Sequence, residues 1–561
     1  MNRSTCLYAS LALALSVSAA AAEPRITRAL PVNGGWQLTV EGVDSPEFRL
    51  DGQPVAATRA GDAWQFTTGA AARRLVVGDG KRDLLALRLL PDTPADAPFN
   101  DWTIYHLMLA DFANGDANND RSGMRRWVHS GYSGGDLQGV LGKVDHLKAL
   151  GVNAVWLSPL FASETSHGYD VMNYYRVGDA VSVPRDREAA MQLYQRTVEA
   201  LHGAGIRVVL DLPLNHGSGS YERQAGDPKG LKPKATSAQQ EAEKTWDSWN
   251  AGFRYWNFAD AGTREFLLDA SRYWLTEGKA DGFRLDYVRG VPPDFWAEFY
   301  AAMKTTKPNA LLFGEAWQDA AAPGPNADDI ATYYAAVPGK GPQFDGLLDF
   351  PLQMVMTEVF ARGTGDASDL EHWLQRTAAQ YGDAGRPVYF LDNHDVSRFL
   401  AWTGERGHER LLAALGFMAA LSSPIVVFYG TETGIKGGRA APGFNDTGRI
   451  AMPWNALDKP LMERVSAILR TRAELPALTR GARLPLLSDD RLLVMRKAHP
   501  SGDVLVAVNL ASEERTVTLP AAAAGSRQDA WTPLIGSTAP VAAADGMLTW
   551  KLPGLTTSWA K

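Results

Sequence analysis

The sequence is nearly free of cysteine, because Cys6 is the only one among 561 residues. An apolar run from Leu7 to Val17 follows the short basic start Met1-Asn2-Arg3 and ends before Ala20-Ala21-Ala22. This order is typical of a secretory signal peptide, so we assign residues 1–22 to one and expect a secreted or periplasmic protein without a membrane anchor after cleavage. The mature chain then contains no cysteine, which excludes disulfides as a source of its stability.

Basic charge is also scarce. Lys and Arg number 56 against 63 Asp and Glu, which gives a net charge of −7, and no long basic run occurs. This balance argues against nucleic acid as a partner. Beyond the first 22 residues no apolar run is long enough to span a membrane. With 45% hydrophobic and 21% charged residues, the composition is that of a globular protein with a large core.

Two β-rich regions frame the chain. Short alternating stretches separated by Gly and Asp turns predict an N-terminal β domain over residues 23–98, which ends in a proline-punctuated linker. The same pattern returns near the C-terminus and predicts a β-sandwich over residues 476–561.

Between them, over residues 99–475, short apolar runs alternate with longer amphipathic segments. The runs are Ile104–Leu109, Ala154–Leu157, Val208–Leu212, Gly282–Leu285, Leu311–Phe313, Leu347–Phe350, Val388–Leu391 and Ile425–Phe428. Eight strands alternating with helices predict an α/β fold, a closed (β/α)8 TIM barrel. An open doubly wound sheet would alternate too, but no run leads into a Gly-x-Gly-x-x-Gly turn. A polar insertion over residues 217–262, after the third run, predicts an inserted subdomain.

Polar residues stand where four of these runs end, and in a barrel the catalytic groups come from such strand ends. The segments are Asp211 to His216, Arg284-Leu285-Asp286, Gly314-Glu315 and Asn393-His394-Asp395. Strand alternation puts Arg284 and Asp286 on one face. Carboxylates brought together in this way repel one another and shift each other's pKa, which is costly unless it serves chemistry. Paired carboxylates are what glycoside hydrolysis requires.

The four segments, in this order, resemble the short conserved regions of the α-amylase family, glycoside hydrolase family 13. Further resemblance lies in Gly151–Pro159, His167–Asp170 and Tyr429–Gly434, and it extends over about residues 100–475. The resemblance implies a retaining hydrolase that cleaves α-1,4-glucosidic linkages in starch, maltooligosaccharides or related glucans through a β-glycosyl-enzyme intermediate.

The resemblance also assigns catalytic roles. It implies that Asp286 is the nucleophile, that Glu315 is the general acid and then the base, and that Asp395 stabilises the transition state. Arg284 is expected to keep Asp286 ionised, since a nearby cation lowers the pKa of a carboxyl.

Six further residues are expected to bind the sugar. His216 and His394 would bind its hydroxyls, Tyr169 would stack on its ring, and Arg398 would contact the site from outside. Where many relatives carry a Lys-His pair, this chain has Arg289-Gly290, so we expect Arg289 to face the leaving group. Trp317 follows the acid, at a position that often touches the acceptor sugar; packing in the core is the alternative. Asp211 is expected to order the barrel rim.

Dense Asp and Asn residues follow the first run and predict a calcium site. The proposed ligands are oxygens of Asn114, Asp116, Asn119, Asp120, Gly134 and Asp136. Oxygen donors at short spacing suit a hard cation. The pattern is similar to the calcium loop of cyclodextrin glucanotransferases; the alternative is an Asx-rich turn.

The subtype stays open. The opening of the barrel and the N-terminal domain are similar to cyclomaltodextrinases and neopullulanases, whereas the signal segment favours a plain α-amylase. A 4-α-glucanotransferase would use the same intermediate. A non-catalytic glycan-binding protein is the alternative of another class, and the presence of all three carboxylates argues against it.

Overall fold

The computed structural model describes residues 23–32, 34–67, 72–120, 133–221, 254–318, 321–383, 385–437, 439–440, 445–446, 448–525, 531–536, 538–543 and 545–561. The expected signal segment, residues 1–22, lies outside them, so secretion stays a prediction. Among the described residues, no helix is both long and apolar enough to cross a membrane.

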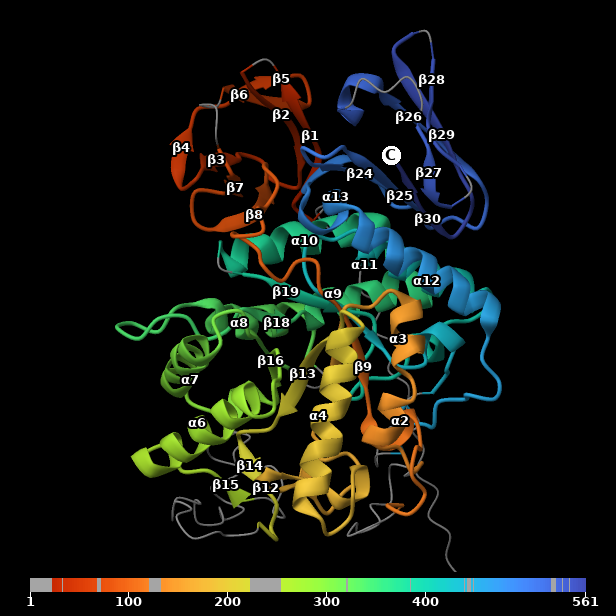
Figure 1. The fold of residues 1–561 in the computed structure, drawn as a ribbon. Helices are drawn as coiled ribbons and strands as arrows, with labels where there is room; N and C mark the ends of the chain where they lie inside the picture. Colours follow the sequence, from red (N-terminus) through yellow and green to blue (C-terminus); the bar gives the residue numbers. More distant parts are fainter. Residues whose placement is uncertain are drawn as a thin grey trace, which may run out of the picture.

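A closed barrel of eight parallel strands forms the centre of the molecule (Figure 1). Its strands are β9 (Thr103–Leu107), β10 (Ala154–Leu157), β13 (Arg207–Leu212), β16 (Gly282–Leu285), β17 (Leu311–Gly314), β18 (Gly346–Leu348), β19 (Pro387–Phe390) and β20 (Ile425–Phe428). Each strand pairs with the next along the chain, and β20 closes on β9. The predicted (β/α)8 barrel is thereby confirmed, with the eight strands in the predicted order.

Helices pack around the barrel. They are α1 (Leu109–Phe112), α2 (Leu137–Leu141), α3 (Val144–Leu150), α4 (Arg187–Gly203), α6 (Ala261–Thr276), α7 (Pro293–Thr306), α8 (Pro323–Tyr334), α9 (Phe350–Met356), α10 (Ala367–Tyr381), α11 (Gly407–Ala419), α12 (Lys459–Glu474) and α13 (Pro476–Arg480). One apolar core lies between strands and helices, and a second fills the barrel with large side chains such as Trp156, Phe313 and Phe390. Filling from both sides explains the nearly complete burial of every barrel strand.

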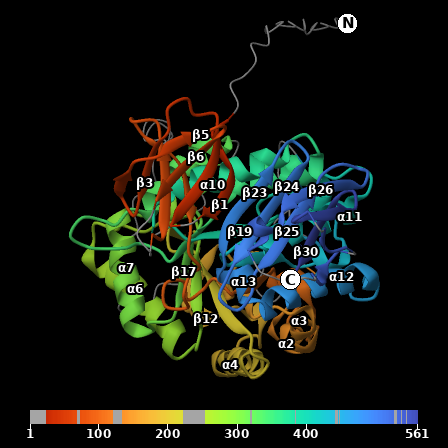
Figure 2. The same cartoon turned by 90° about the horizontal axis from the view of Figure 1, so that it is seen from above.

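Two β domains stand at one end of the barrel (Figure 1). The first pairs two four-stranded sheets, β1 (Arg25–Val32), β2 (Gly35–Glu41), β6 (Ala63–Thr67) and β5 (Thr58–Ala60) in one, and β4 (Gln53–Val55), β3 (Glu47–Leu50), β7 (Arg74–Gly78) and β8 (Asp83–Arg88) in the other. The second has β23 (Ala482–Ser488), β24 (Leu492–Ala498), β25 (Val504–Asn509), β30 (Thr556–Ala560) and β27 (Pro533–Ile535) facing β26 (Arg515–Pro520), β29 (Met547–Leu552) and β28 (Val541–Ala542). Viewed from above, the two domains lie side by side over α10 (Figure 2).

The other end of the barrel carries the loops. A hairpin of β11 (Phe161–Ser163) and β12 (Val171–Val177) follows β10, and β14 (His216–Gly217) pairs with β15 (Arg254–Tyr255). Residues 222–253 of the expected insertion lie outside the described residues. The pairing of β14 with β15 holds the two ends of that insertion together beside the C-terminal end of β13, and thus next to the predicted catalytic residues.

Candidate active site

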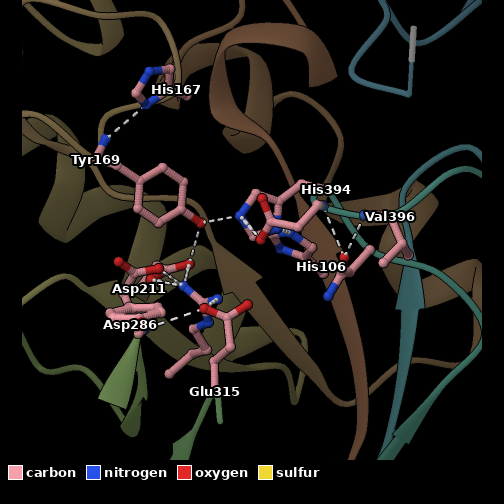
Figure 3. Close-up of polar contacts among 12 residues, drawn as sticks. His106, His167, Tyr169, Asp211, Asp286, Glu315, His394 and Val396 are labelled. Carbon is pink, nitrogen blue, oxygen red and sulfur yellow. Dashed lines mark hydrogen bonds and ion pairs between the residues drawn. The ribbon is translucent and has the colours of Figure 1, made fainter. Parts of the chain in front are cut away.

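Arg284 contacts three carboxylates, those of Asp211, Asp286 and Glu315, which Figure 3 labels. Its Nη1 donates to Asp211 Oδ1 at 2.9 Å and to Asp286 Oδ1 at 2.6 Å. Its Nη2 lies 2.7 Å from Glu315 Oε2. Asp211 stands opposite Arg284 in the register of β13 with β16, and Glu315 directly follows the next strand, β17. One fully buried guanidinium therefore joins the ends of three adjacent strands.

A second group of side chains surrounds His394, which follows β19. His394 Nε2 lies 3.1 Å from Asp395 Oδ2, and the ring stacks on Tyr169 with an interplanar angle of 2°. Arg449 Nη2 lies 2.9 Å from Asp395 Oδ1, and its Nε donates to the backbone oxygen of His394 at 2.9 Å. Asp395 is thus held from both sides by a ring and a guanidinium.

Tyr169 connects the two groups. Its hydroxyl donates to Asp211 Oδ2 at 2.7 Å and is also hydrogen-bonded to His394 Nε2 (Figure 3). Asp211 accepts a further bond from Trp156 Nε1 at 2.9 Å. Because Asp211 is buried and receives bonds from Arg284, Tyr169 and Trp156, its carboxylate serves to orient these groups, as expected for a residue of the barrel rim.

Burial sets the protonation of the two carboxyls that share Arg284. It raises the pKa of Glu315 to about 8 and that of Asp286 to about 7, while Arg284 acts in the opposite direction on both. The expectation that Arg284 lowers the pKa of Asp286 therefore describes one contribution, which burial outweighs. Burial thus favours the protonated form of Glu315, as a general acid requires, and Arg284 favours the ionised form of Asp286, as a nucleophile requires.

The histidines of the site are neutral near pH 7. Burial lowers the pKa of His216 to about 4 and that of His394 well below its ordinary value. Both are therefore able to exchange hydrogen bonds with sugar hydroxyls without adding charge beside the carboxylates. His216 belongs to β14, where its ring lies 6.2 Å from that of Tyr255.

A family model of the alpha-amylase catalytic domain matches residues 106–254 and 250–463, which is more than half of the chain. The chain belongs to the α-amylase family. A cyclomaltodextrinase of Bacillus sp is 30% identical to it over 403 residues, which span 68% of this chain and 67% of that protein. The α-amylase of Geobacillus thermoleovorans, solved in complex with acarbose, is 26% identical with a TM-score of 0.69 over 82% of this chain and 98% of that one. A solved cyclomaltodextrinase, 23% identical, shares the fold over 96% of this chain and 98% of its own, with a TM-score of 0.70. The chain is a glycoside hydrolase.

Arg284 and the carboxyls of Asp211, Asp286, Glu315 and Asp395, with the side chains that join them, form the carboxylate network of this α-amylase-family enzyme. Three predicted sugar-binding residues lie outside it. Arg289 Nε pairs with Asp329 of α8 at 2.7 Å, and the ring of Trp317 stacks on Phe350 at 5.1 Å. Arg398 is 1% exposed and donates to the backbone oxygens of Gly448 and Tyr429. Its bonds hold the loop after β20, so the structure gives Arg398 a positioning role in place of the expected contact from outside.

Two residues of the network were missed in the sequence. His106, in β9, contacts His394 Nδ1 at 3.1 Å and stacks on Trp156. Strand alternation could have found it, because it points into the barrel like Ile104. Arg449 had no such signal, since it follows β20 at a distance along the chain and reaches Asp395 only through the path of that loop.

The sequence crowds Trp246, Trp249, Tyr255 and Trp256 into the insertion, where they form either a local core or a sugar-binding wall. Trp246 and Trp249 lie outside the described residues. Trp256 is 1% exposed, and its Nε1 lies 3.3 Å from the hydroxyl of Tyr174. Trp256 is therefore part of the apolar core, which is the first of these two alternatives.

In the predicted calcium loop, three residues, Gly115, Asp116 and Asn119, are hydrogen-bonded to Asp136. This carboxylate accepts bonds from the backbone N–H groups of Gly115, Asp116 and Gly139 and from Asn119 Nδ2. It therefore caps α2 and holds the loop closed. Among the described residues, no group of three or more His, Cys, Asp or Glu side chains could hold a metal, so a cation here would need amide and carbonyl oxygens in addition to carboxylates.

Part of that loop fits a cation. Asn119 Oδ1 is buried and has no hydrogen-bond partner among the described residues. Gly134 has a φ of +79°, and a Cβ there would lie 2.2 Å from Asn114 Nδ2 and 2.7 Å from Asp120 Oδ1. The backbone of Gly134 thus lies directly against two of the expected ligands, and oxygen donors of this kind suit calcium.

Proposed function

We propose that this enzyme is a retaining hydrolase of α-1,4-glucosidic linkages in starch, maltooligosaccharides or related glucans. The observation that carries the proposal is the bridge that Arg284 makes between Asp286 and Glu315 at the loop-bearing end of the barrel. One cation shared by two carboxyls holds them close enough for a nucleophile and an acid to act on the same glycosidic bond. Asp395 is the third carboxylate.

Glu315 would begin the reaction as the acid. Its Oε1 is buried and has no hydrogen-bond partner among the described residues, while Oε2 is held by Arg284. A proton on Oε1 is therefore available to the glycosidic oxygen. Asp286 would attack the anomeric carbon as the bond to that oxygen breaks. Water, deprotonated by Glu315, would then displace Asp286 and restore both carboxyls.

His216, His394 and Tyr169 would bind the sugar at the cleaved bond, and Asp395 would hold its hydroxyls. Arg289 and Trp317 lie farther from the carboxylate network and would contact the sugar on the leaving-group side. The similarity to a cyclomaltodextrinase favours cyclodextrin or pullulan as additional substrates. Chromatography of the products from amylose, pullulan and cyclodextrin distinguishes a plain α-amylase from this alternative and from a transglycosylase.

The stereochemistry of the first product tests the proposal. A nucleophile and an acid about 5–5.5 Å apart give retention through two displacements. We expect NMR of freshly released maltooligosaccharides to show the α-anomer first, followed by slow mutarotation. Release of the β-anomer first would contradict the assignment of Asp286 as nucleophile.

We also propose that calcium binds Asn114, Asn119, Asp120 and the backbone oxygen of Gly134, with Asp116 and Asp136 completing the site. The ion would supply charge that holds the two ends of the loop after β9 together. A chelator should lower the melting temperature and added calcium should restore it. The gain would be about 2.7 kcal/mol at a hundredfold excess over Kd.

Asp116→Ala combined with Asp120→Ala should abolish this response, while Glu188→Ala, on the exposed face of α4, should leave it intact. Asp136 is avoided in this test because its substitution would also uncap α2. An unchanged melting temperature on adding calcium to metal-free protein, together with a metal analysis that finds no calcium in protein purified without chelator, would refute the site.

A further inference from the structure

A cleft lies where both β domains meet the barrel, at the end of the barrel opposite to the carboxylates. Figure 1 shows the two β domains standing at this end. Its volume, including the part that is open to solvent, is about 850 Å³. Its walls come from β7 and β8, from the C-terminal half of α10, from β19 and β23 with the residues before them, and from the residues that precede β20. The cleft thus joins three parts of the chain and shares no residue with the active site.

The walls of this cleft are rich in arginine. Arg74, Arg88, Arg386 and Arg483 line it, and Asp92 is the one carboxylate among the lining residues. Arg74 pairs with Asp383, Arg88 with Asp92 and Arg483 with Glu371. Arg386 donates to the backbone oxygens of Asp383 and Gly385, and its nearest carboxylate oxygen, on Asp92, is 4.0 Å away. Three of the four arginines are therefore paired with a carboxylate, and Arg386 is the least neutralised cation of the lining.

Two more cations lie behind the wall. Lys497 is fully buried, and its Nζ donates to Ser422 Oγ at 2.5 Å, its one hydrogen bond among the described residues. Arg472 is also fully buried and donates to four backbone oxygens, including those of Leu421 and Ser423. Neither has a carboxylate within 4 Å in the described part of the chain. Ser422 and Ser423 line the cleft, so both cations stand directly behind it.

These basic side chains favour an anion as the ligand of the cleft. Burial makes the charged forms of both groups costly, so it lowers the pKa of Lys497 well below its ordinary value and that of Arg472 to about 9. An anion in the cleft would offset this cost. Guanidinium groups match the oxygens of phosphate in geometry as well as in charge. A glucan fits less well, because the cleft's two tyrosines, Tyr381 and Tyr389, are 5% and 7% exposed and offer no face for stacking.

We propose that this cleft is a binding site for a phosphate-class oxyanion, either inorganic phosphate or the phosphate group of a sugar phosphate. Arg386 and Arg88 contact the anion from the barrel and from the N-terminal domain, and Lys497 stabilises it through Ser422. The bound anion joins the N-terminal domain to the barrel, and its effect is therefore on the stability of that junction and not on the chemistry at the far end.

The test is calorimetric titration and thermal melting of the full-length protein with inorganic phosphate, glucose 1-phosphate and chloride at equal ionic strength. Phosphate should bind and raise the melting temperature, and chloride should not. Tighter binding of glucose 1-phosphate assigns the site to a sugar phosphate, and equal binding assigns it to free phosphate. Arg386→Gln and Lys497→Met should each weaken phosphate binding at least about tenfold. Arg362→Gln, an exposed arginine outside the cleft, should bind as the wild type does.

Lys497→Met also reports on folding, because it replaces a buried amine by an apolar side chain of similar length. In the absence of phosphate, this variant should have a melting temperature no lower than that of the wild type. Hydrolysis of starch should be unchanged in these variants. The proposal is overturned if phosphate acts no differently from chloride, or if both cleft variants bind it like the wild type. Stabilisation by maltotriose that depends on Arg386 would assign the cleft to a glucan instead.

Discussion

Replacement of Asp286 by Asn or of Glu315 by Gln is expected to slow hydrolysis of maltooligosaccharides at least roughly 10³-fold, because each removes a nucleophile or an acid from the reaction. Both substitutions preserve the shape of the side chain beside Arg284, so the fold should persist. Initial rates measure the first effect, and circular dichroism with thermal melting checks the second.

Chemical rescue separates the two roles. The Asp286→Ala variant should regain part of its hydrolysis of an activated glycosyl fluoride when azide is added, since the small anion can occupy the place of the missing carboxylate. Asp269→Asn, on the exposed surface of α6, is the matched control and should keep full activity. Near-wild-type hydrolysis of starch by Asp286→Asn or Glu315→Gln would refute the assignment.

Loss of Arg284 should affect both stability and rate. Arg284→Met would leave Asp211, Asp286 and Glu315 buried together without their shared cation. Removal of one partner from a buried ion pair costs about 3–5 kcal/mol, so a clear drop in melting temperature is expected. Activity should fall at least about 10²-fold, because Asp286 and Glu315 lose the group that orients them.

The pH dependence of the residual activity provides the specific readout. A cation lowers the pKa of a neighbouring carboxyl, so its removal raises the pKa of Asp286. The acidic limb of the pH–rate profile of the variant should therefore lie at a higher pH than that of the wild type. Arg284→Lys keeps the charge but lacks the planar fork, and it should recover more stability than activity. A wild-type pH profile in Arg284→Met would show that Arg284 does not control these carboxyls.

The sequence by itself determined the barrel and the positions of its catalytic candidates. Regular alternation of apolar runs with amphipathic segments requires buried parallel strands, and in a barrel the ends of those strands meet at one face. Period-two alternation then placed Arg284 and Asp286 on the same side. These are local rules, so Asp286, Glu315, His394 and Asp395 could be found without coordinates.

Only the tertiary structure decided which groups touch across the site and beyond it. Arg449 reaches Asp395 through a loop whose path no local pattern encodes, and Trp256 packs into the core although its sequence neighbours suggested a sugar contact. The cleft around Arg386 combines residues from three separate parts of the chain. Contacts of this kind depend on how whole elements pack against one another. The energy of that packing is the sum of many weak atomic contacts between distant parts of the chain, which short sequence motifs do not encode.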